Sequence, residues 1–337
     1  MTISHQEAHQ EKNFEIEVML EKVFRIIHEG VILHEYLTDK EYSTLAVTLK
    51  NISPPLRTLR ISQCQDKPLT TYALSQLLRN NMTLEYFHLE ANQVESDAIQ
   101  AIASILKRNA SLQSFTCSLI NNELTTDDIA SLADMLLENK SLKELNLYAT
   151  GITAEKTKLL ATALEKNPTL KKLNLASNEI FDEGAMAIAN ALSHNTNLTE
   201  LNLSDCRIGN NGIKTLFSAL KQNTTMQTIT LCRLTTESIQ SLSEMIMENK
   251  GLQKLNLPLY TSQFNIEQIQ LLLDAVKKNN SLREINIRDD DGKLKNEINE
   301  IQQILTKNKE TIVVQQPVEP PKEEAAPVKK EEPTTKK

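Results

Sequence analysis

The sequence has very little glycine and few aromatic side chains. Of its 337 residues, seven are Gly, 4% are aromatic and none is Trp. So little glycine argues against a collagen-like chain, a Gly-rich phosphate-binding loop and a dinucleotide-binding fold. No apolar run reaches the roughly 18 residues that cross a bilayer, and the first 30 residues lack the basic start and apolar run of a secretory signal peptide. We therefore expect neither membrane insertion nor a Sec-type signal.

Cysteine is also scarce, and the charge balance is acidic. The four cysteines form no C-x-x-C pair and have no His at ligand spacing, so we expect no metal and no other cofactor. Free thiols are typical of a reducing, cytoplasmic compartment. The net charge of -7 argues against nucleic acid as a partner, because phosphate binding needs clustered Lys and Arg, although a local basic patch remains open. The cysteines are Cys64, Cys117, Cys206 and Cys232.

Leucine and asparagine are abundant, with 48 and 29 copies, and both follow an internal repeat. The segment LKKLNLASNEI at 170–180 recurs as LTELNLSDCRI at 198–208 and as LKELNLYATGI at 142–152. Nine copies at a near-constant spacing of about 28 residues predict an array of one repeated structural unit. The copies begin at Leu56, Leu84, Leu112, Leu142, Leu170, Leu198, Met226, Leu252 and Leu282, and Asn stands three residues before all but the first.

Each unit reads as a strand, a turn, a helix and a short loop. The fourth and sixth positions of L-x-x-L-x-L share one face of a strand, and an apolar stripe with 3.6-residue spacing follows, as in Ile213, Leu216, Phe217 and Leu220. Hydroxyl side chains occupy the expected helix N-caps. These are Ser96, Thr126 and Thr153.

One unit cannot bury its apolar face alone, so the units must stack, with the strands in a parallel sheet and the helices outside. Helices are wider than paired strands, and the array must therefore curve into a horseshoe. The pattern L-x-x-L-x-L-x-x-N/C-x-I with this period resembles the ribonuclease-inhibitor class of leucine-rich repeat proteins. The resemblance implies an α/β solenoid with a concave sheet, and a ninth-position Asn or Cys that bonds backbone inside the arc. Asn178, Cys64 and Cys206 fit this position, whereas Thr150 departs from it.

We predict three regions. Residues 1–27 form an N-terminal cap with an amphipathic helix over 13–27, and residues 28–314 form the repeat domain, with 28–55 as a degenerate first repeat. A last helix around Ile298–Leu305 and a short strand at Ile312–Val314 end the array. Residues 315–337, rich in Pro, Glu and Lys, cannot bury enough apolar surface to offset ordering, and we expect them to be disordered.

Outward positions of the strands are the candidate binding residues. A first cluster combines Arg60, Tyr86, His88 and Glu90 with Tyr148, since Tyr and Arg are enriched at binding hot spots. A second combines Arg233, Arg288 and Asp289 with Asp205. Two further rows are better explained by structure than by binding. At the fifth strand position stacked Asn side chains can bond one another, and at the third the alternating charges can pair across strands.

A catalytic role is not expected. Only His88 faces the concave side, with no Ser or Cys at nucleophile spacing. Cys232 falls at an outward position without a base, whereas Cys64, Cys117 and Cys206 match inward packing positions.

The sequence favours a non-catalytic, monomeric protein-binding scaffold. The Glu pairs of the tail (Glu323, Glu324, Glu331, Glu332) resemble the C-terminal signals of effectors exported by Dot/Icm type IV secretion, and the repeats resemble leucine-rich repeat effectors of intracellular bacteria. That resemblance implies translocation into a host cytosol and a host protein as partner. The alternative is a small-GTPase regulator, because Ran GTPase-activating proteins share this repeat type; a GTP hydrolysis assay discriminates between the two.

Overall fold

The computed structural model describes most of the repeat domain. The described residues are 25–27, 30–33, 43, 46–47, 56–62, 70–79, 81–92, 94–95, 97–119, 123–231, 234–260, 263–288 and 292–313. The predicted tail at 315–337 and most of the predicted N-terminal cap lie outside them.

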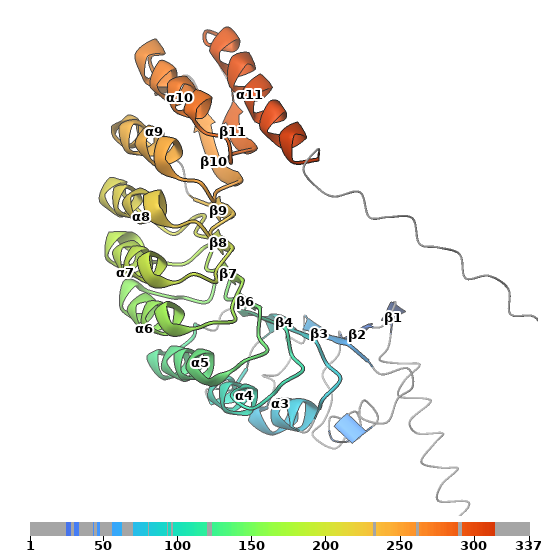
Figure 1. Cartoon of the computed structure of the whole chain (residues 1–337). Helices are drawn as coiled ribbons and strands as arrows, with labels where there is room; N and C mark the ends of the chain where they lie inside the picture. Colours follow the sequence, from blue (N-terminus) through green and yellow to red (C-terminus); the bar gives the residue numbers. More distant parts are fainter. Residues whose placement is uncertain are drawn as a thin grey trace, which may run out of the picture.

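Eleven strands form one sheet in chain order (Figure 1). Ten of them, β2 to β11, pair in parallel with their neighbours. They line the inner side of an arc whose outer side carries the helices, as the stacking argument predicts. The strands are β1 (Arg25–Ile27), β2 (Gly30–Leu33), β3 (Thr58–Ser62), β4 (Tyr86–Asn92), β5 (Ser114–Leu119), β6 (Glu144–Asn146), β7 (Lys172–Asn174), β8 (Glu200–Asn202), β9 (Thr228–Thr230), β10 (Lys254–Tyr260) and β11 (Glu284–Arg288).

A helix follows each strand from β3 onward, which returns the chain to begin the next parallel strand. A short 3-10 helix, η1 (Thr236–Ser238), directly precedes α9. The helices are α3 (Thr71–Leu78), α4 (Ala98–Leu106), α5 (Thr126–Glu138), α6 (Ala154–Lys166), α7 (Phe181–His194), α8 (Asn210–Gln222), α9 (Ile239–Glu248), α10 (Ile266–Lys278) and α11 (Lys295–Val313).

The two ends of the array differ from the sequence prediction. Residues 25–27, expected to end the capping helix, form β1 and pair antiparallel with β2. Strand β2 pairs in parallel with β3, with Val31 opposite Leu59 and Leu33 opposite Ile61, which confirms the strand register of the degenerate first repeat. At the other end, Ile312 and Val313 belong to α11 rather than to a strand, because the helical register of the last apolar stripe continues through them.

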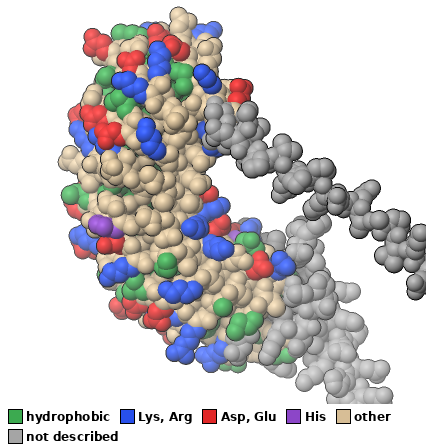
Figure 2. All heavy atoms as spheres, viewed as in Figure 1, with side chains coloured by type: hydrophobic (Ala, Val, Ile, Leu, Met, Phe, Trp, Pro, Cys, Tyr) green, Lys and Arg blue, Asp and Glu red, His purple; other side chains and the backbone are tan. Residues whose placement is uncertain are grey.

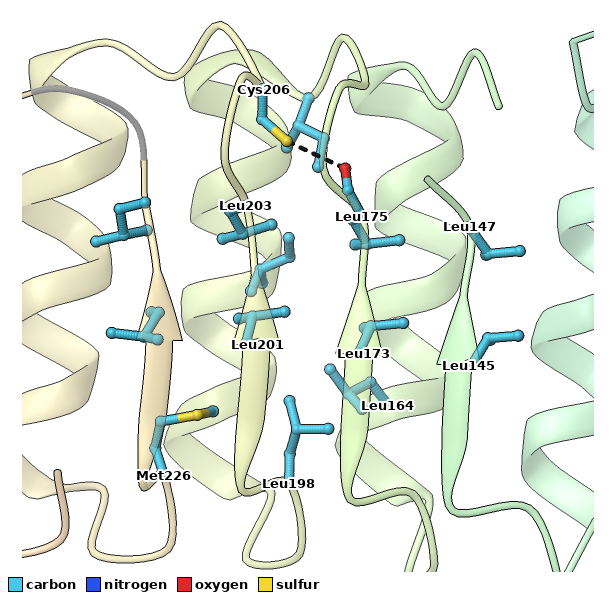
Figure 3. Packing of buried hydrophobic residues seen from close by; sticks show 14 of the residues in the cluster. Leu145, Leu147, Leu164, Leu173, Leu175, Leu198, Leu201, Leu203, Cys206 and Met226 are labelled. Carbon is cyan, nitrogen blue, oxygen red and sulfur yellow. Dashed lines mark hydrogen bonds between the residues drawn. The ribbon is translucent and has the colours of Figure 1, made fainter. Parts of the chain in front are cut away.

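The core is the layer between sheet and helices. Leu145, Leu173 and Leu201 stack across neighbouring strands with less than 5% of each side chain exposed, and Figure 3 shows them with the next inward row. Burying each such side chain contributes roughly 1.5–3 kcal/mol. The predicted stripe Ile213, Leu216, Phe217 and Leu220 is likewise buried.

Helix starts follow their side-chain chemistry, with one shift from the sequence prediction. The N-cap of α5 is Thr125, not Thr126, and the side chains of Thr125 and Asp128 cap each other's backbone N–H groups. Thr153 caps α6 as predicted. Ser96 lies outside the described residues.

Asparagine side chains tie successive repeats together through the loop before each strand. Asn195 shows the pattern: its Oδ1 accepts from the N–H groups of Asn197 and Leu198 at 2.9 and 2.8 Å, and its Nδ2 donates to the carbonyl of Leu164 in the preceding repeat at 2.6 Å. The sequence marked this asparagine only as a landmark of register. The same arrangement recurs at Asn109, Asn139, Asn167, Asn223, Asn249 and Asn279.

Ser243 of α9 is a local defect in the core. It is 1% exposed, and its Oγ has no hydrogen-bond partner within the part of the chain that the structure describes. The equivalent position in α5, α6 and α7 is a buried alanine, at Ala133, Ala161 and Ala189. We expect Ser243→Ala to raise the free energy of unfolding by about 1 kcal/mol, because a buried hydroxyl without a partner is removed at no loss of packing. Urea denaturation followed by circular dichroism measures the change.

Ser193 provides the matched control, since it is exposed and its Oγ donates to the Ala189 carbonyl at 3.1 Å. Ser193→Ala should change the free energy of unfolding by less than about 0.5 kcal/mol. A destabilising effect of Ser243→Ala would show that the hydroxyl has a partner in solution.

Candidate protein-binding surface

The concave face carries a hollow of about 540 Å³ that runs along the sheet from β4 to β10. In this hollow, in-register pairing of neighbouring strands lines up the polar side chains of successive repeats in rows across the sheet. Its lining is His88, Ser114, Thr116, Glu144, Leu145, Asn146, Lys172, Leu173, Asn174, Glu200, Leu201, Asn202, Thr228, Thr230, Lys254 and Asn256. On the face seen in Figure 2, hydrophobic side chains occur in small separate groups among charges of both signs.

Charged side chains at the third strand position pair across neighbouring strands, as one interpretation of the sequence predicts. The Lys172 Nζ lies 3.1 Å from Glu144 Oε1 and 3.4 Å from Glu200 Oε1. The hydrogen bond and charge of Glu144, assisted by Glu200, raise the pKa of Lys172 above its ordinary value. Lys254 and Glu284 repeat the pairing at 2.8 Å. These charges therefore largely neutralise one another on the floor of the hollow.

Most asparagines of the fifth strand position bond differently from the prediction, although Asn256 Nδ2 donates across strands to Thr230 Oγ1 at 3.2 Å. Instead of the expected bonds between asparagines, the Oδ1 atoms of Asn146, Asn174 and Asn202 accept the backbone N–H two residues on in the same repeat. In these repeats the strand ends at the asparagine itself. The backbone N–H two residues later lies beyond the strand and bonds to the asparagine side chain. The amide NH₂ groups are thereby left at the hollow as hydrogen-bond donors.

Four residues of the first predicted cluster do come together. β3 and β4 pair with Thr58 opposite Tyr86 and Arg60 opposite His88. Glu90 lies near both neighbours, with Oε2 3.8 Å from Arg60 Nη1 and Oε1 3.6 Å from His88 Nδ1. Tyr86 stands two residues before His88 on the same face and is 39% exposed. The cluster thus combines an Arg60–Glu90 ion pair and a neighbouring histidine with an accessible tyrosine.

Tyr148 lies apart from this cluster. It begins the turn after β6, two strands away from β4, or roughly 10 Å across the sheet. The side chain is 44% exposed, and its N–H donates to Asn146 Oδ1 at 3.1 Å. Of the second predicted cluster, Arg233 and Asp289 lie outside the described residues, the side chain of Arg288 is not described, and Asp205 is exposed in the turn after β8.

His88 is held as a neutral ring by its surroundings. Burial, followed by the positive charge of Arg60, lowers its pKa below the ordinary value of 6.5, although Glu90 and Glu144 act in the opposite direction. Its Nδ1 lies 3.1 Å from Thr116 Oγ1. A neutral, hydrogen-bonded imidazole serves here as a fixed polar contact.

This pKa has a consequence for stability. Below pH 6.5 the unfolded chain binds the His88 proton more readily than the folded chain, so the free energy of unfolding falls as pH falls toward the lowered pKa. We expect the wild type to lose more stability than His88→Gln between pH 7.5 and pH 5.5. Urea midpoints of both proteins at the two pH values measure the difference. Equal losses would show that His88 has its ordinary pKa.

The described cysteines are packing residues. Cys117 and Cys206 are buried free thiols, in agreement with their inward positions in the repeat, and burial raises the pKa of the Cys117 thiol. Cys206 donates its S–H to the Leu175 carbonyl at 3.1 Å, which is the bond to a neighbouring turn that the ninth position implies (Figure 3). Asn178 does the same with the turn of the preceding repeat. Cys64 and Cys232 lie outside the described residues.

The described part of the chain has neither a metal-binding cluster nor a membrane-spanning helix. Within the described ranges there is no group of three or more His, Cys, Asp or Glu side chains that could hold a metal ion. No described helix is both long enough and apolar enough to span a bilayer.

Phe181, the first residue of α7, is an exposed aromatic side chain that the sequence did not indicate as a candidate binding residue. It is 39% exposed and has a φ of 53°. A bulky side chain in the left-handed region is uncommon. Only its place in the register, where other repeats carry Thr153 or Gly209 as N-cap, indicated that it departs from the pattern.

Comparison with known proteins agrees with the repeat. A family model described as Leucine Rich repeat matches residues 166–189 and 194–217. No curated protein matches the sequence.

The chain is similar to several solved structures. The leucine-rich repeat-containing protein LegL7 from Legionella pneumophila matches with a TM-score of 0.51 and 17% identity, over 84% of this chain and 94% of that one. The tropomodulin C-terminal domain of Caenorhabditis elegans matches with 0.42 and 13%, over 49% and 98%, and leiomodin-1 actin-binding site 2 with 0.37 and 21%, over 56% and 94%. Of these three, only LegL7 exceeds a TM-score of 0.5, and at its identity it shows the fold alone. The chain carries leucine-rich repeats and folds as an α/β leucine-rich repeat solenoid.

Proposed function

We propose that this protein is a monomeric, non-catalytic scaffold that binds a protein partner through the N-terminal half of its concave face. The observation that carries the proposal is the placement of Tyr86 beside the network of Arg60, His88 and Glu90. An exposed Tyr in a rigid polar frame combines a large contact area with fixed hydrogen-bonding groups. Tyr148 extends this surface toward the centre of the arc.

The test is affinity capture from cytosol with mass spectrometry, followed by direct binding to the captured partner. We expect Tyr86→Ala to weaken binding at least tenfold, and Tyr148→Ala to weaken it by a smaller factor. Tyr72→Ala is the matched control, because Tyr72 is 51% exposed but lies on α3, on the convex side. If the Tyr86 and Tyr148 variants both bind as the wild type does, the concave surface is not the binding site.

We further propose that the partner is a host protein and that the chain is an effector delivered into a host cytosol by type IV secretion. The support is the Glu-rich tail, with its pairs Glu323, Glu324 and Glu331, Glu332. A translocation assay compares the full chain with residues 1–314 and with a full-length variant in which the four glutamates are Ala. Loss of translocation in both is expected; undiminished export of residues 1–314 would contradict the proposal.

A further inference from the structure

Basic side chains gather on the edge of the solenoid where helices end and strands begin. In three successive repeats this edge carries Arg108, Lys140, Lys143, Lys166 and Lys171, which we call the basic edge patch. All but Lys171 are exposed, and Lys171 is half-buried. The backbone N–H of Lys171 donates to the carbonyl of Lys143 at 2.7 Å, which places these two residues side by side just before neighbouring strands.

Helix ends alone do not explain this patch. A cation in the last turn offsets the negative end of a helix dipole, and Lys166 has that position in α6. Lys143 and Lys171 instead stand just before β6 and β7, at a position that is not basic in most repeats. The other repeats carry Arg57, Glu85, Gln113, Thr199, Gln227, Gln253 and Arg283 there. Two adjacent repeats with Lys at this position add charge that helix ends do not explain.

The carboxylates beside the patch are already paired with other cations. Glu138 lies 3.1 Å from Lys107 Nζ, and Glu144 and Glu200 both bind Lys172. Among the described residues, no carboxylate lies within 4.0 Å of a patch cation. Lys171 Nζ donates to the Asn197 carbonyl at 3.2 Å, which fixes its stem but leaves its charge uncompensated.

Acidic side chains occur on both edges of these repeats. On the patch edge, Glu138 lies 3.1 Å from Lys107 Nζ and Glu165 lies 3.9 Å from His194 Nδ1, whereas the acidic side chains of the opposite edge lie at helix starts. First turns of α5, α6 and α7 carry Asp127, Glu155, Asp182 and Glu183. A helix of 13 residues separates the edges by roughly 20 Å, more than twice the Debye length of about 8 Å at physiological ionic strength. An anionic surface at the basic edge is therefore screened from the acidic side chains at the helix starts.

The composition of the patch favours a lipid surface over a protein. Four of its five cations are Lys, which carries a point charge on a flexible stem and is depleted at protein interfaces, whereas Arg is enriched there. The hollow of the concave face is not lined by any patch residue. Met82 occupies the loop position of Lys140 two repeats earlier, with Ala110 between them, and is 68% exposed. An accessible apolar side chain on the same edge as the cations suits a membrane interface.

We propose that the basic edge patch docks the solenoid edge-on to an anionic phospholipid surface, with Met82 at the headgroups. This contact is peripheral and uses residues distinct from the concave cluster. The horseshoe then stands on the membrane with its concave face open to a second protein. The inference does not depend on the proposed concave binding site.

Sedimentation with phospholipid vesicles tests the proposal on the full chain. Vesicles of phosphatidylcholine alone are compared with vesicles containing about 30% phosphatidylserine. The patch variant carries Lys140→Gln, Lys143→Gln, Lys166→Gln and Lys171→Gln. The matched control carries Lys156→Gln, Lys158→Gln, Lys214→Gln and Lys295→Gln, which removes the same charge from other faces. Circular dichroism confirms that both fold.

We expect the wild type and the control variant to sediment with phosphatidylserine vesicles and not with phosphatidylcholine alone. The patch variant should bind at least 100-fold more weakly, since each cation near such a surface contributes about 1 kcal/mol. Binding should also weaken as salt is raised. Absence of wild-type binding, or equal loss in both variants, overturns the proposal. So does binding of an acidic polypeptide by the patch without any vesicle binding.

Discussion

Replacement of Asn195 by Ala is expected to lower the free energy of unfolding by about 3 kcal/mol. The side chain is 3% exposed and makes four hydrogen bonds, two that close its own loop and two that reach the preceding repeat. Alanine leaves the buried N–H of Leu198 without its partner and also removes the acceptor of the Asn197 N–H. The Leu164 carbonyl loses the Asn195 donor and keeps only the N–H of Asn167 at 3.2 Å. Each lost buried partner costs about 1–3 kcal/mol. Urea denaturation and amide hydrogen exchange measure the effect.

Amide hydrogen exchange also shows which repeats are destabilised by Asn195→Ala. Because repeats contact only their neighbours, we expect faster exchange in α6–β7 and β8–α8 on both sides of residue 195. Asn190→Ala is the control, since Asn190 is exposed on α7 and alanine is the better helix former. An Asn195→Ala protein as stable as the Asn190→Ala protein would contradict a structural role for the asparagine row.

Replacement of Gly251 by Ala is expected to cost about 3 kcal/mol, because a Cβ atom has no room there. An ideal Cβ at this position lies 2.3 Å from the carbonyl oxygen of Thr224, which is backbone and cannot rotate away. Other repeats carry Ser141, Thr169 or Asn197 in the same register. The seventh repeat is two residues shorter than the regular period, from Met226 to Leu252, and its loop has no such space. Forcing an extra group into a packed site costs about 1–3 kcal/mol and at times more.

Gly292→Ala is the control for Gly251→Ala, because it distinguishes the stability lost to a steric clash from the stability lost to an unfavourable backbone conformation. Gly292 has a φ of 70° but nothing within 4 Å of its ideal Cβ, so alanine there should cost only the roughly 1–2 kcal/mol of a left-handed backbone. Denaturation midpoints of both variants provide the comparison. Equal costs would show that the loop at Gly251 moves freely.

The sequence predicts the repeating part of the fold well, because one pattern is imposed many times. Each strand face and helix stripe has only one way to bury Leu145 or Leu216 beside its neighbours, so register, parallel pairing and curvature all follow. The ends lack that constraint. Arg25–Ile27 carries an apolar pattern that suits either a helix or a strand, and pairing with β2 decides it. At α11 no further repeat follows to stop the helix before Ile312.

The candidate site was predicted only where the strand register determines it. Arg60, Tyr86 and His88 share a face because β3 and β4 pair in register. Tyr148 stands apart because it lies two repeats further on, so two strand spacings separate it from Tyr86, as the repeat numbering already implies. Its position in the turn rather than on a strand depends on β6 ending at Asn146. The basic edge was hidden, because its cations come from different positions of three repeats and meet only when the loops stack. Summing the charges of the interrepeat loops in neighbouring repeats would have revealed it.

Photo-crosslinking is the most direct test of the proposed binding of a protein partner to the concave face. A photoreactive phenylalanine replaces Tyr86 in one protein and Leu271, which is 40% exposed on α10 of the convex face, in another. After irradiation in cytosol, we expect one discrete crosslinked partner from position 86 and none from position 271. Crosslinking from position 271 but not from position 86 would show that the partner binds the helices, and the proposal would be wrong.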